Sequence, residues 1–303
     1  MTLAPGPNAQ QQEYWLDLGR DWAAAAAVME HRLSAWGDAA IEHVGVAAGD
    51  RVVDIGCGAG GTTIALARLV GTGGSALGLD ISLSMLTEAR REGAASGVAH
   101  LSFEEGDAQV YPFEPGRLDL AFSRFGVMFF EDPVAAFANI GAGLRAGGRL
   151  GFACWGSPSE NPAQSRVREA VSRVVELPPV DLAGPGPHSL GTEEVLRRVL
   201  GAAGYVDLRL ELLRLETPVG GTAGSAEEMV EGMLMLGPAR EALTHQPELK
   251  PQLTAEMMKE FGAEWRPGGM WLPGAVWLVA ADWPGLSDAT ATATATAVTA
   301  EDE

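Results

Sequence analysis

Three closely spaced glycines follow an acid at the end of an apolar segment, and together they form the motif best suited to chemistry. The acid is Asp54, and Gly56, Gly58 and Gly60 follow at alternate positions before a helix-like segment begins at Gly61. Glycines at this spacing let the backbone turn sharply and approach a ligand that a Cβ would keep away. The N–H groups at the following helix start favour a polar or anionic ligand group. The motif therefore predicts a nucleotide-like cofactor at the carboxyl edge of a parallel sheet.

The glycines alone do not decide the cofactor. Gly56, Gly58 and Gly61 also satisfy the dinucleotide fingerprint, so NAD(P) remains an alternative. Asp54 argues against it, because a carboxylate just before the turn would face an incoming pyrophosphate. The same carboxylate suits a ligand with a cationic amino-acid end. The pattern from Asp54 to Gly60 resembles the first motif of class I S-adenosylmethionine (SAM) methyltransferases, whose cofactor carries an ammonium and a sulfonium but no phosphate. The sequence therefore favours SAM.

Two further acids follow the next two strand-like segments. Asp80 ends the second one, where a carboxylate can accept hydrogen bonds from both ribose hydroxyls. Its alternative role is to cap the following helix, which Ser82 could also do. Asp107 follows the third segment, where the resemblance implies an acceptor for the exocyclic amine of adenine. Its alternative role is to form a turn. The order of Asp54, Asp80 and Asp107 along the strands favours the ligand roles.

The resemblance continues beyond these motifs. Residues 119–137 and the turn at 144–150 resemble bacterial methyltransferase-domain proteins related to the UbiE and SmtA groups. In that turn, Ala146 stands where the family has proline. The resemblance covers roughly residues 45–155. It implies an α/β fold, a Rossmann-like seven-stranded and mostly parallel sheet, with N-terminal helices and a helical cap insert.

The resemblance also implies binding roles along the chain. The residues expected to bind SAM, or its product S-adenosyl-L-homocysteine, are Tyr14, Trp22, Asp54, Gly56, Cys57, Gly58, Gly60, Thr63, Asp80, Ile81, Met85, Gly106, Asp107, Ala108, Gln109, Ser123, Arg124 and Phe125. The chain leaving the fourth strand must pass the transferable methyl group, so acceptor contacts are expected there and in the cap segments. The residues expected to contact the acceptor are Trp15, Met128, Phe129, Trp155, His188 and Met233.

His188 is the candidate general base. A neutral imidazole near pH 7 is the commonest base, and the loop around His188 joins the cap to the sheet. The alternative is an exposed loop histidine. No group of His, Cys and Asp has metal-ligand spacing, and no Gly-x-Ser-x-Gly hydrolase motif occurs. We interpret the chain as a SAM-dependent methyltransferase for a small apolar or aromatic acceptor. The alternatives are a SAM-fold protein that cyclises or only binds its ligand, and an NAD(P)-dependent oxidoreductase.

The elements that position these residues alternate between strand and helix. Strands are predicted at residues 51–55, 75–79, 101–105, 118–123, 149–154, 206–213 and 275–281. Helices are predicted at 61–70, 82–96, 133–144, 163–175 and 192–203, with a helical run over 14–44 that is interrupted near Gly19. This alternation of apolar strands and helices is typical of a parallel sheet covered on both faces.

We divide the chain accordingly. The expected parts are a helical lid at 1–44, a SAM-binding core at 45–155, a cap loop and helix at 156–189, the C-terminal part of the sheet at 190–221 and 270–285, a helical cap insert at 222–269, and a disordered tail at 286–303. The tail alternates Ala and Thr before it becomes acidic, which is typical of low-complexity sequence.

Composition disfavours several classes of partner. The net charge of −19 would repel nucleic acid and anionic membrane surfaces, so a small molecule is the expected partner. No signal peptide or membrane-spanning segment is recognised, and a cytoplasmic location is expected. The two cysteines, Cys57 and Cys154, make no disulfide or metal spacing. We expect a monomer or a homodimer.

Overall fold

A seven-stranded sheet forms the centre of the computed structural model, which describes residues 7–24, 26–219, 223–235, 237–267 and 269–285. The strand order is β3-β2-β1-β4-β5-β7-β6, and the strands are parallel except β7, which is antiparallel to both of its neighbours. The strands are β1 (Arg51–Ile55), β2 (Ser75–Asp80), β3 (Leu101–Glu105), β4 (Leu118–Arg124), β5 (Leu144–Trp155), β6 (Val206–Val219) and β7 (Met270–Trp283). The predicted mostly parallel sheet is confirmed.

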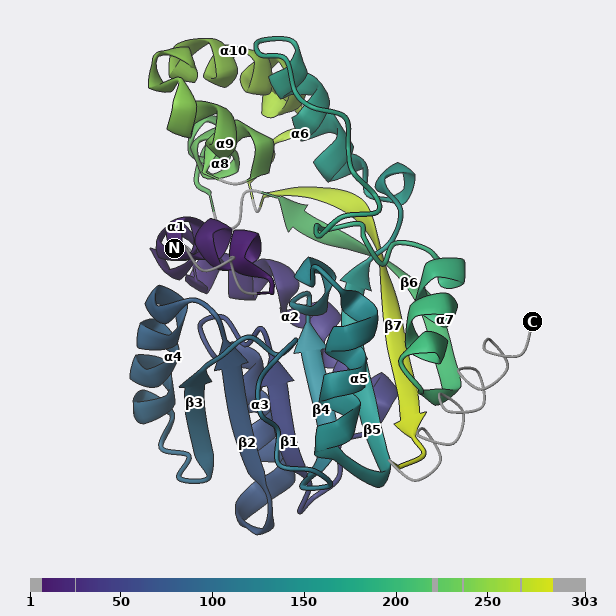
Figure 1. Ribbon diagram of the computed structural model, residues 1–303. Helices are drawn as coiled ribbons and strands as arrows, with labels where there is room; N and C mark the ends of the chain where they lie inside the picture. The colour runs from purple at the N-terminus through teal and green to yellow at the C-terminus, as the bar shows by residue number, and fades with distance from the viewer. Residues whose placement is uncertain (1–6, 25, 220–222, 236, 268, 286–303) are drawn as a thin grey trace, which may run out of the picture.

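Helices cover both faces of this sheet (Figure 1). On β5, Gly151 leaves room for Val44 of α2, whereas the ring of the next residue, Phe152, stacks on Phe137 of α5. Successive side chains of a strand point to opposite faces, so α2 and α5 cover different faces. The covering helices are α2 (Ala26–Val44), α3 (Gly61–Val70), α4 (Leu83–Ser96), α5 (Pro133–Gly143) and α7 (Glu193–Ala202), while α1 (Ala9–Ala24) packs on α4 and α2. In the described parts of the chain, no helix is long and apolar enough to cross a bilayer.

A separate group of helices, the cap, lies beyond the carboxyl ends of the parallel strands (Figure 1). It has its own apolar core, which includes Met229, Leu253 and Phe261. The cap helices are α6 (Pro162–Ser172), α8 (Ala226–Leu234), α9 (Gly237–His245) and α10 (Lys250–Phe261). Short 3-10 helices complete the chain at Gly71–Gly73, Val127–Phe129, Pro158–Glu160, Pro247–Leu249 and Gly262–Glu264.

The strands β6 and β7 carry the cap. The sequence predicts strands at 206–213 and 275–281, but both elements have 14 residues. Their pairing continues from Val206 opposite Asp282 to Val219 opposite Met270, where the ribbon joins the apolar core of the cap. The predicted strand was too short because β7 also includes Pro273 and Gly274, residue types that are uncommon inside strands.

The N-terminal helices break at a different place from the one predicted. Helix α1 passes through Gly19 without interruption, and α1 and α2 flank residue 25. A Cβ at position 19 would lie 2.1 Å from Ser82 Oγ and 2.9 Å from Ser84 Oγ. Gly19 therefore lets α1 pack closely against the start of α4, a role that the sequence alone does not distinguish from helix breaking. This packing places α1 over the edge of the sheet where the candidate ligand residues gather.

Candidate cofactor and acceptor site

The glycine turn after β1 has the backbone geometry that its sequence predicts. Gly56, Gly58 and Gly60 have φ values of 66°, 56° and 85°, in the left-handed region that favours glycine. A Cβ at Gly56 would lie 2.8 Å from the Cα of Gly126, which follows β4. The N–H groups of Gly56 and Cys57 both donate to the carbonyl of Leu79, at 2.8 and 3.1 Å. The turn is therefore fixed between the ends of neighbouring strands.

Asp80 ends β2 directly beside this turn. Its Oδ2 accepts a hydrogen bond from the N–H of Gly58 at 2.8 Å, and its Oδ1 accepts one from the N–H of Ser82 at 2.9 Å. Burial raises the pKa of Asp80, while these backbone donors act in the opposite direction. Each carboxylate oxygen can accept a second hydrogen bond. Asp80 thus orients the glycine turn and still presents free acceptor capacity to a ligand.

Asp54 is a buried carboxyl group with one unpartnered oxygen. Its Oδ2 accepts a hydrogen bond from Thr63 Oγ1 at 2.7 Å, but its Oδ1 is buried with no hydrogen-bond partner. Burial is the main cause that raises the pKa of Asp54 to about 7. A cationic ligand group placed against Oδ1 would favour the ionised form. This environment fits an ammonium group better than a phosphate.

Asp107 has a similar unpartnered oxygen at the other end of the sheet edge. Its Oδ1 accepts hydrogen bonds from the Gln109 N–H at 2.9 Å and from Asn8 Nδ2 at 3.2 Å. Its Oδ2 is buried with no partner. Asn8 is itself fixed by Glu131, since each backbone N–H donates to the other's side chain. The structure therefore offers an acceptor in a fixed position, as the exocyclic amine of an adenine would require.

The chain leaving β4 forms the wall between these acids and the cap. Phe125 has a φ of 63°, a conformation that non-glycine residues rarely adopt and that concentrates at functional sites. Its ring stacks on Trp155, with centroids 4.6 Å apart and an interplanar angle of 18°. Arg124 makes a two-pronged ion pair with Glu30 of α2, at 3.0 and 2.7 Å. The wall thus presents the stacked rings of Phe125 and Trp155, and the charge of Arg124 in it is neutralised by Glu30.

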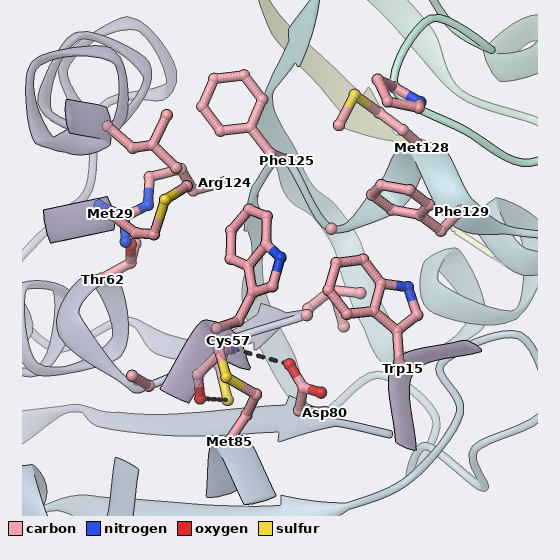
Figure 2. A pocket seen from close by; sticks show the side chains of 18 of the residues that line it. Trp15, Met29, Cys57, Thr62, Asp80, Met85, Arg124, Phe125, Met128 and Phe129 are labelled. Atoms are coloured by element: carbon pink, nitrogen blue, oxygen red, sulfur yellow. Dashed lines mark hydrogen bonds between the residues drawn. The ribbon is translucent and has the colours of Figure 1, made fainter. Parts of the chain in front are cut away.

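One continuous cavity of about 380 Å³ connects the acids to the cap. Figure 2 shows Asp80 and Met85 at one end, with Phe125 and Met128 at the other and Trp15 beside Phe129. The rings of Trp15 and Phe129 meet edge to face, with centroids 5.0 Å apart. The end beneath the cap is lined by Ala163, Gln164, Val167, Val219, Met233, Gly237 and Pro238. The volume lies in the range of small-molecule sites.

The comparisons with known proteins agree with this geometry. Residues 52–148 match a family model described as a methyltransferase domain. The chain is 38% identical to aklanonic acid methyltransferase DauC of Streptomyces sp. (strain C5) over 104 residues, which are 34% of this chain and 47% of that protein. It is also 38% identical to the ubiquinone/menaquinone biosynthesis C-methyltransferase UbiE of Teredinibacter turnerae over 121 residues, 40% of this chain and 48% of that protein. Residues 52–148 therefore belong to the methyltransferase-domain family.

Solved structures show the same fold for this methyltransferase. YcgJ of Bacillus subtilis superposes with a TM-score of 0.54 at 17% identity, covering 84% of this chain and 98% of that one. The Haemonchus contortus phosphoethanolamine N-methyltransferase 2, solved with S-adenosylhomocysteine, has a TM-score of 0.51 at 20% identity, covering 82% and 52%. The chain spans about half the length of the curated relatives that it matches. The predictions of family, fold and SAM as the family's cofactor are confirmed.

Most of the residues that the sequence assigns to this methyltransferase site line the cavity. The predicted cofactor residues in the wall are Trp22, Asp54, Gly56, Cys57, Gly58, Asp80, Ile81, Met85, Gly106, Asp107, Ala108, Arg124 and Phe125. The predicted acceptor residues in the wall are Trp15, Met128, Phe129, Trp155 and Met233. Their individual binding roles stay predictions.

Four predicted cofactor residues support the wall instead of forming it. Thr63 donates to Asp54, and Ser123 Oγ donates to the carbonyl of Ile55 at 2.7 Å. Gln109 Oε1 accepts from the Asp132 N–H at 3.1 Å. Gly60 is the left-handed residue before α3. These side chains and turns bind the protein's own polar groups, so the cavity reaches none of the four.

Tyr14 and His188 also lie outside the cavity wall. Tyr14 is 46% exposed on α1, while its neighbour Trp15 faces the cavity. His188 Nδ1 donates to the carbonyl of Gly156 at 2.7 Å, which leaves Nε2 as the acceptor nitrogen. Burial lowers the pKa of His188 and favours the neutral imidazole. The preceding residue, Pro187, does line the cavity. The role of His188 as a general base stays a prediction.

Sequence reasoning missed the residues that α1, α2 and the cap contribute. Helix α2 supplies Ala26, Met29, Glu30 and Leu33, whose spacing of three and four places them on one helix face. That periodicity could have identified them. Asn8 carries no such signal, because its role depends on contacts with Asp107 and Glu131, which are distant in sequence.

Proposed function

We propose that this methyltransferase transfers the methyl group of SAM to a small, largely apolar molecule held beneath the cap. The observation that supports this most directly is the continuous cavity that runs from Asp54, Asp80 and Asp107 to an apolar end. Polar acceptors at one end suit the cofactor, and aromatic and aliphatic side chains at the other suit the acceptor.

The unpartnered oxygens fit the donors of SAM. Asp54 Oδ1 would accept from the ammonium group, and Asp107 Oδ2 from the adenine amine. Asp80 would accept from the ribose hydroxyls with the lone pairs left by its backbone donors. The sulfonium of the bound cofactor makes its methyl group electrophilic without further activation. The protein's own contribution is to hold the acceptor in line with that methyl group and to keep water away.

The titratable groups of the cavity favour an acceptor that arrives already nucleophilic. Among the described residues of the wall, no histidine, lysine or tyrosine occurs. Glu30 is neutralised by Arg124, and burial raises the pKa of the Cys57 thiol well above its ordinary value. A phenolate, enolate or similar anion needs no strong base at the moment of transfer. The described residues also contain no group of three His, Cys, Asp or Glu side chains that could hold a metal ion.

The relatives support a small-molecule acceptor. The names of two relatives refer to aklanonic acid and to ubiquinone/menaquinone biosynthesis. The net charge of −19 makes nucleic acid an unfavourable acceptor for this chain.

Two measurements test the proposal. Calorimetry should show S-adenosylhomocysteine binding with no comparable signal for NADH. Mass spectrometry with SAM bearing a labelled methyl group should then detect transfer to a member of a panel of small aromatic and polyketide-like molecules. Tight NADH binding without S-adenosylhomocysteine binding, or methylation of tRNA in preference to any small molecule, would refute the proposal.

A further inference from the structure

Arg32 is a cation in the cavity wall that no anion of the described chain neutralises. It lines the cavity, and its Nε is buried with no hydrogen-bond partner. No hydrogen bond or ion pair connects its guanidinium to any other residue that the structure describes. Arg124, the other arginine of the wall, contrasts with it because Glu30 binds both of its terminal nitrogens. The cavity thus contains one satisfied arginine and one unsatisfied arginine.

The position of Arg32 on α2 places it on the side of the helix that packs against the acceptor wall. Arg32 lies three residues after Met29 and four before Trp36, so these side chains share one side of the helix. Trp36 is fully buried, and its ring lies edge to face with Trp155 of the acceptor wall, at 6.3 Å between centroids. Glu30 is two residues from Arg32, about 200° around an α-helix. Glu30 and Arg32 therefore project from α2 in different directions, although both line the cavity, and Glu30 meets Arg124.

An unpaired guanidinium in this environment is costly for the free protein. Charged side chains are seldom buried without a partner, because they lose hydration without gaining an ion pair. Burial lowers the pKa of Arg32, and no nearby carboxylate opposes this effect. The guanidinium nevertheless stays protonated in proteins. Val167, Val219 and Met233, which line the end of the cavity beneath the cap, are apolar and provide no compensation. A ligand that carries an anion would supply the missing partner.

We propose that Arg32 is a specificity-determining residue that binds a carboxylate group on the acceptor. This inference rests on the proposed function, because it takes the ligand at this end of the cavity to be the methyl acceptor. The planar guanidinium matches a carboxylate with two parallel hydrogen bonds, a geometry that lysine does not reproduce. The net charge of −19 repels anions, so a cation inside the cavity also offsets the field that an acidic ligand meets on entry.

The test compares two ligands of nearly equal shape on the protein saturated with S-adenosylhomocysteine. The probes are 2-naphthoate and its neutral amide, 2-naphthamide, titrated by calorimetry into wild type, Arg32→Met, Arg32→Lys and Arg198→Met. Arg198 is exposed on α7, so its substitution removes the same charge far from the cavity. Wild type and Arg198→Met should bind the carboxylate at least about tenfold more tightly than the amide. Arg32→Met should lose this preference, and Arg32→Lys should keep part of it.

The outcomes separate this inference from the proposed function. Equal binding of the two probes to wild type, or binding of neither, shows that Arg32 does not select a carboxylate. If Arg32→Met weakens S-adenosylhomocysteine binding while the preference for the carboxylate persists, Arg32 serves the carboxylate of the cofactor and the inference is wrong. Failure of wild type to bind S-adenosylhomocysteine contradicts the proposed function instead. The carboxylate preference is then measured on the cofactor-free protein, where retention of the effect still supports the role of Arg32.

Discussion

Substitution of Asp54 by asparagine tests whether this buried carboxyl group is reserved for a cation. Asp54 has a pKa raised from 3.8 to about 7, mainly by burial. Because the folded pKa lies above the unfolded one, the folded protein binds more protons between pH 4 and 7. Its stability therefore falls as the pH rises through this interval. Each pH unit between the two pKa values corresponds to about 1.4 kcal/mol, so the full effect is about 4 kcal/mol.

Asparagine removes this ionisation while it keeps an oxygen for the Thr63 hydroxyl. The free energy of unfolding of wild type, relative to Asp54→Asn, should fall by about 2–3 kcal/mol between pH 5 and pH 8. Urea unfolding of the cofactor-free proteins at both pH values measures this difference. Asp38→Asn, an exposed change on α2, is the control and should follow wild type. An identical pH dependence for wild type and Asp54→Asn would refute the reasoning.

The same carboxyl group links cofactor binding to proton release. An ammonium group against Oδ1 favours the ionised form, so binding of S-adenosylhomocysteine near pH 7 should release a fraction of a proton and become tighter as the pH rises through 7. Calorimetry in buffers of different ionisation enthalpy measures the release, and proton uptake would contradict it. Asp80→Asn should weaken S-adenosylhomocysteine binding at least about tenfold, because the ligand loses a charged hydrogen-bond acceptor. The control is Glu105→Gln, which changes an exposed carboxylate. Unchanged affinity in Asp80→Asn would show that Asp80 only orients the glycine turn. Gly126→Ala places a Cβ 2.6 Å from the Ile55 carbonyl oxygen, so the free energy of unfolding in urea should fall by about 1–3 kcal/mol. In the control, Gly201→Ala, the new Cβ meets nothing within 4 Å, and stability should not fall. Once the screen identifies an acceptor, His188→Ala should lower turnover about 10²-fold with cofactor affinity unchanged if His188 is the base; normal turnover would assign it to the loop alone.

The sequence predicts the part of the site that strand order determines. Asp54, Asp80 and Asp107 each follow a strand, and parallel strands bring their carboxyl ends to one edge, so local pattern was enough to place them together. Polar residues near those ends were harder to assign. Ser123 and Gln109 have the right types for ligand binding, but both bind the protein's own backbone. Which hydrogen bond a side chain makes depends on its neighbours in space, and single-sequence patterns do not contain that information.

The acceptor end was predicted only in outline for the same reason. Asn8 contacts Asp107 and Glu131 from a distant segment, and no spacing rule connects Asn8 or Arg32 to the glycine turn. The ribbon of β6 and β7 was also underestimated, because its outer half pairs only with itself and ends in the cap. The cap and the sheet have separate apolar cores, and the outer half of the ribbon extends from one to the other. The sequence alone does not reveal this separation.

The ribbon has a consequence for how such enzymes can diversify. The cap has its own apolar core and joins the sheet mainly through two paired strands, so its sequence can change with little disturbance of the packing around Asp54 and Asp80. The cofactor half is constrained by buried acids and close glycine contacts, whereas the cap half is constrained only by its own interior. Exchanging residues 220–269 between relatives that share the ribbon should therefore alter only the part of the acceptor site that the cap contributes, while Trp15, Trp155 and Arg32 stay in place.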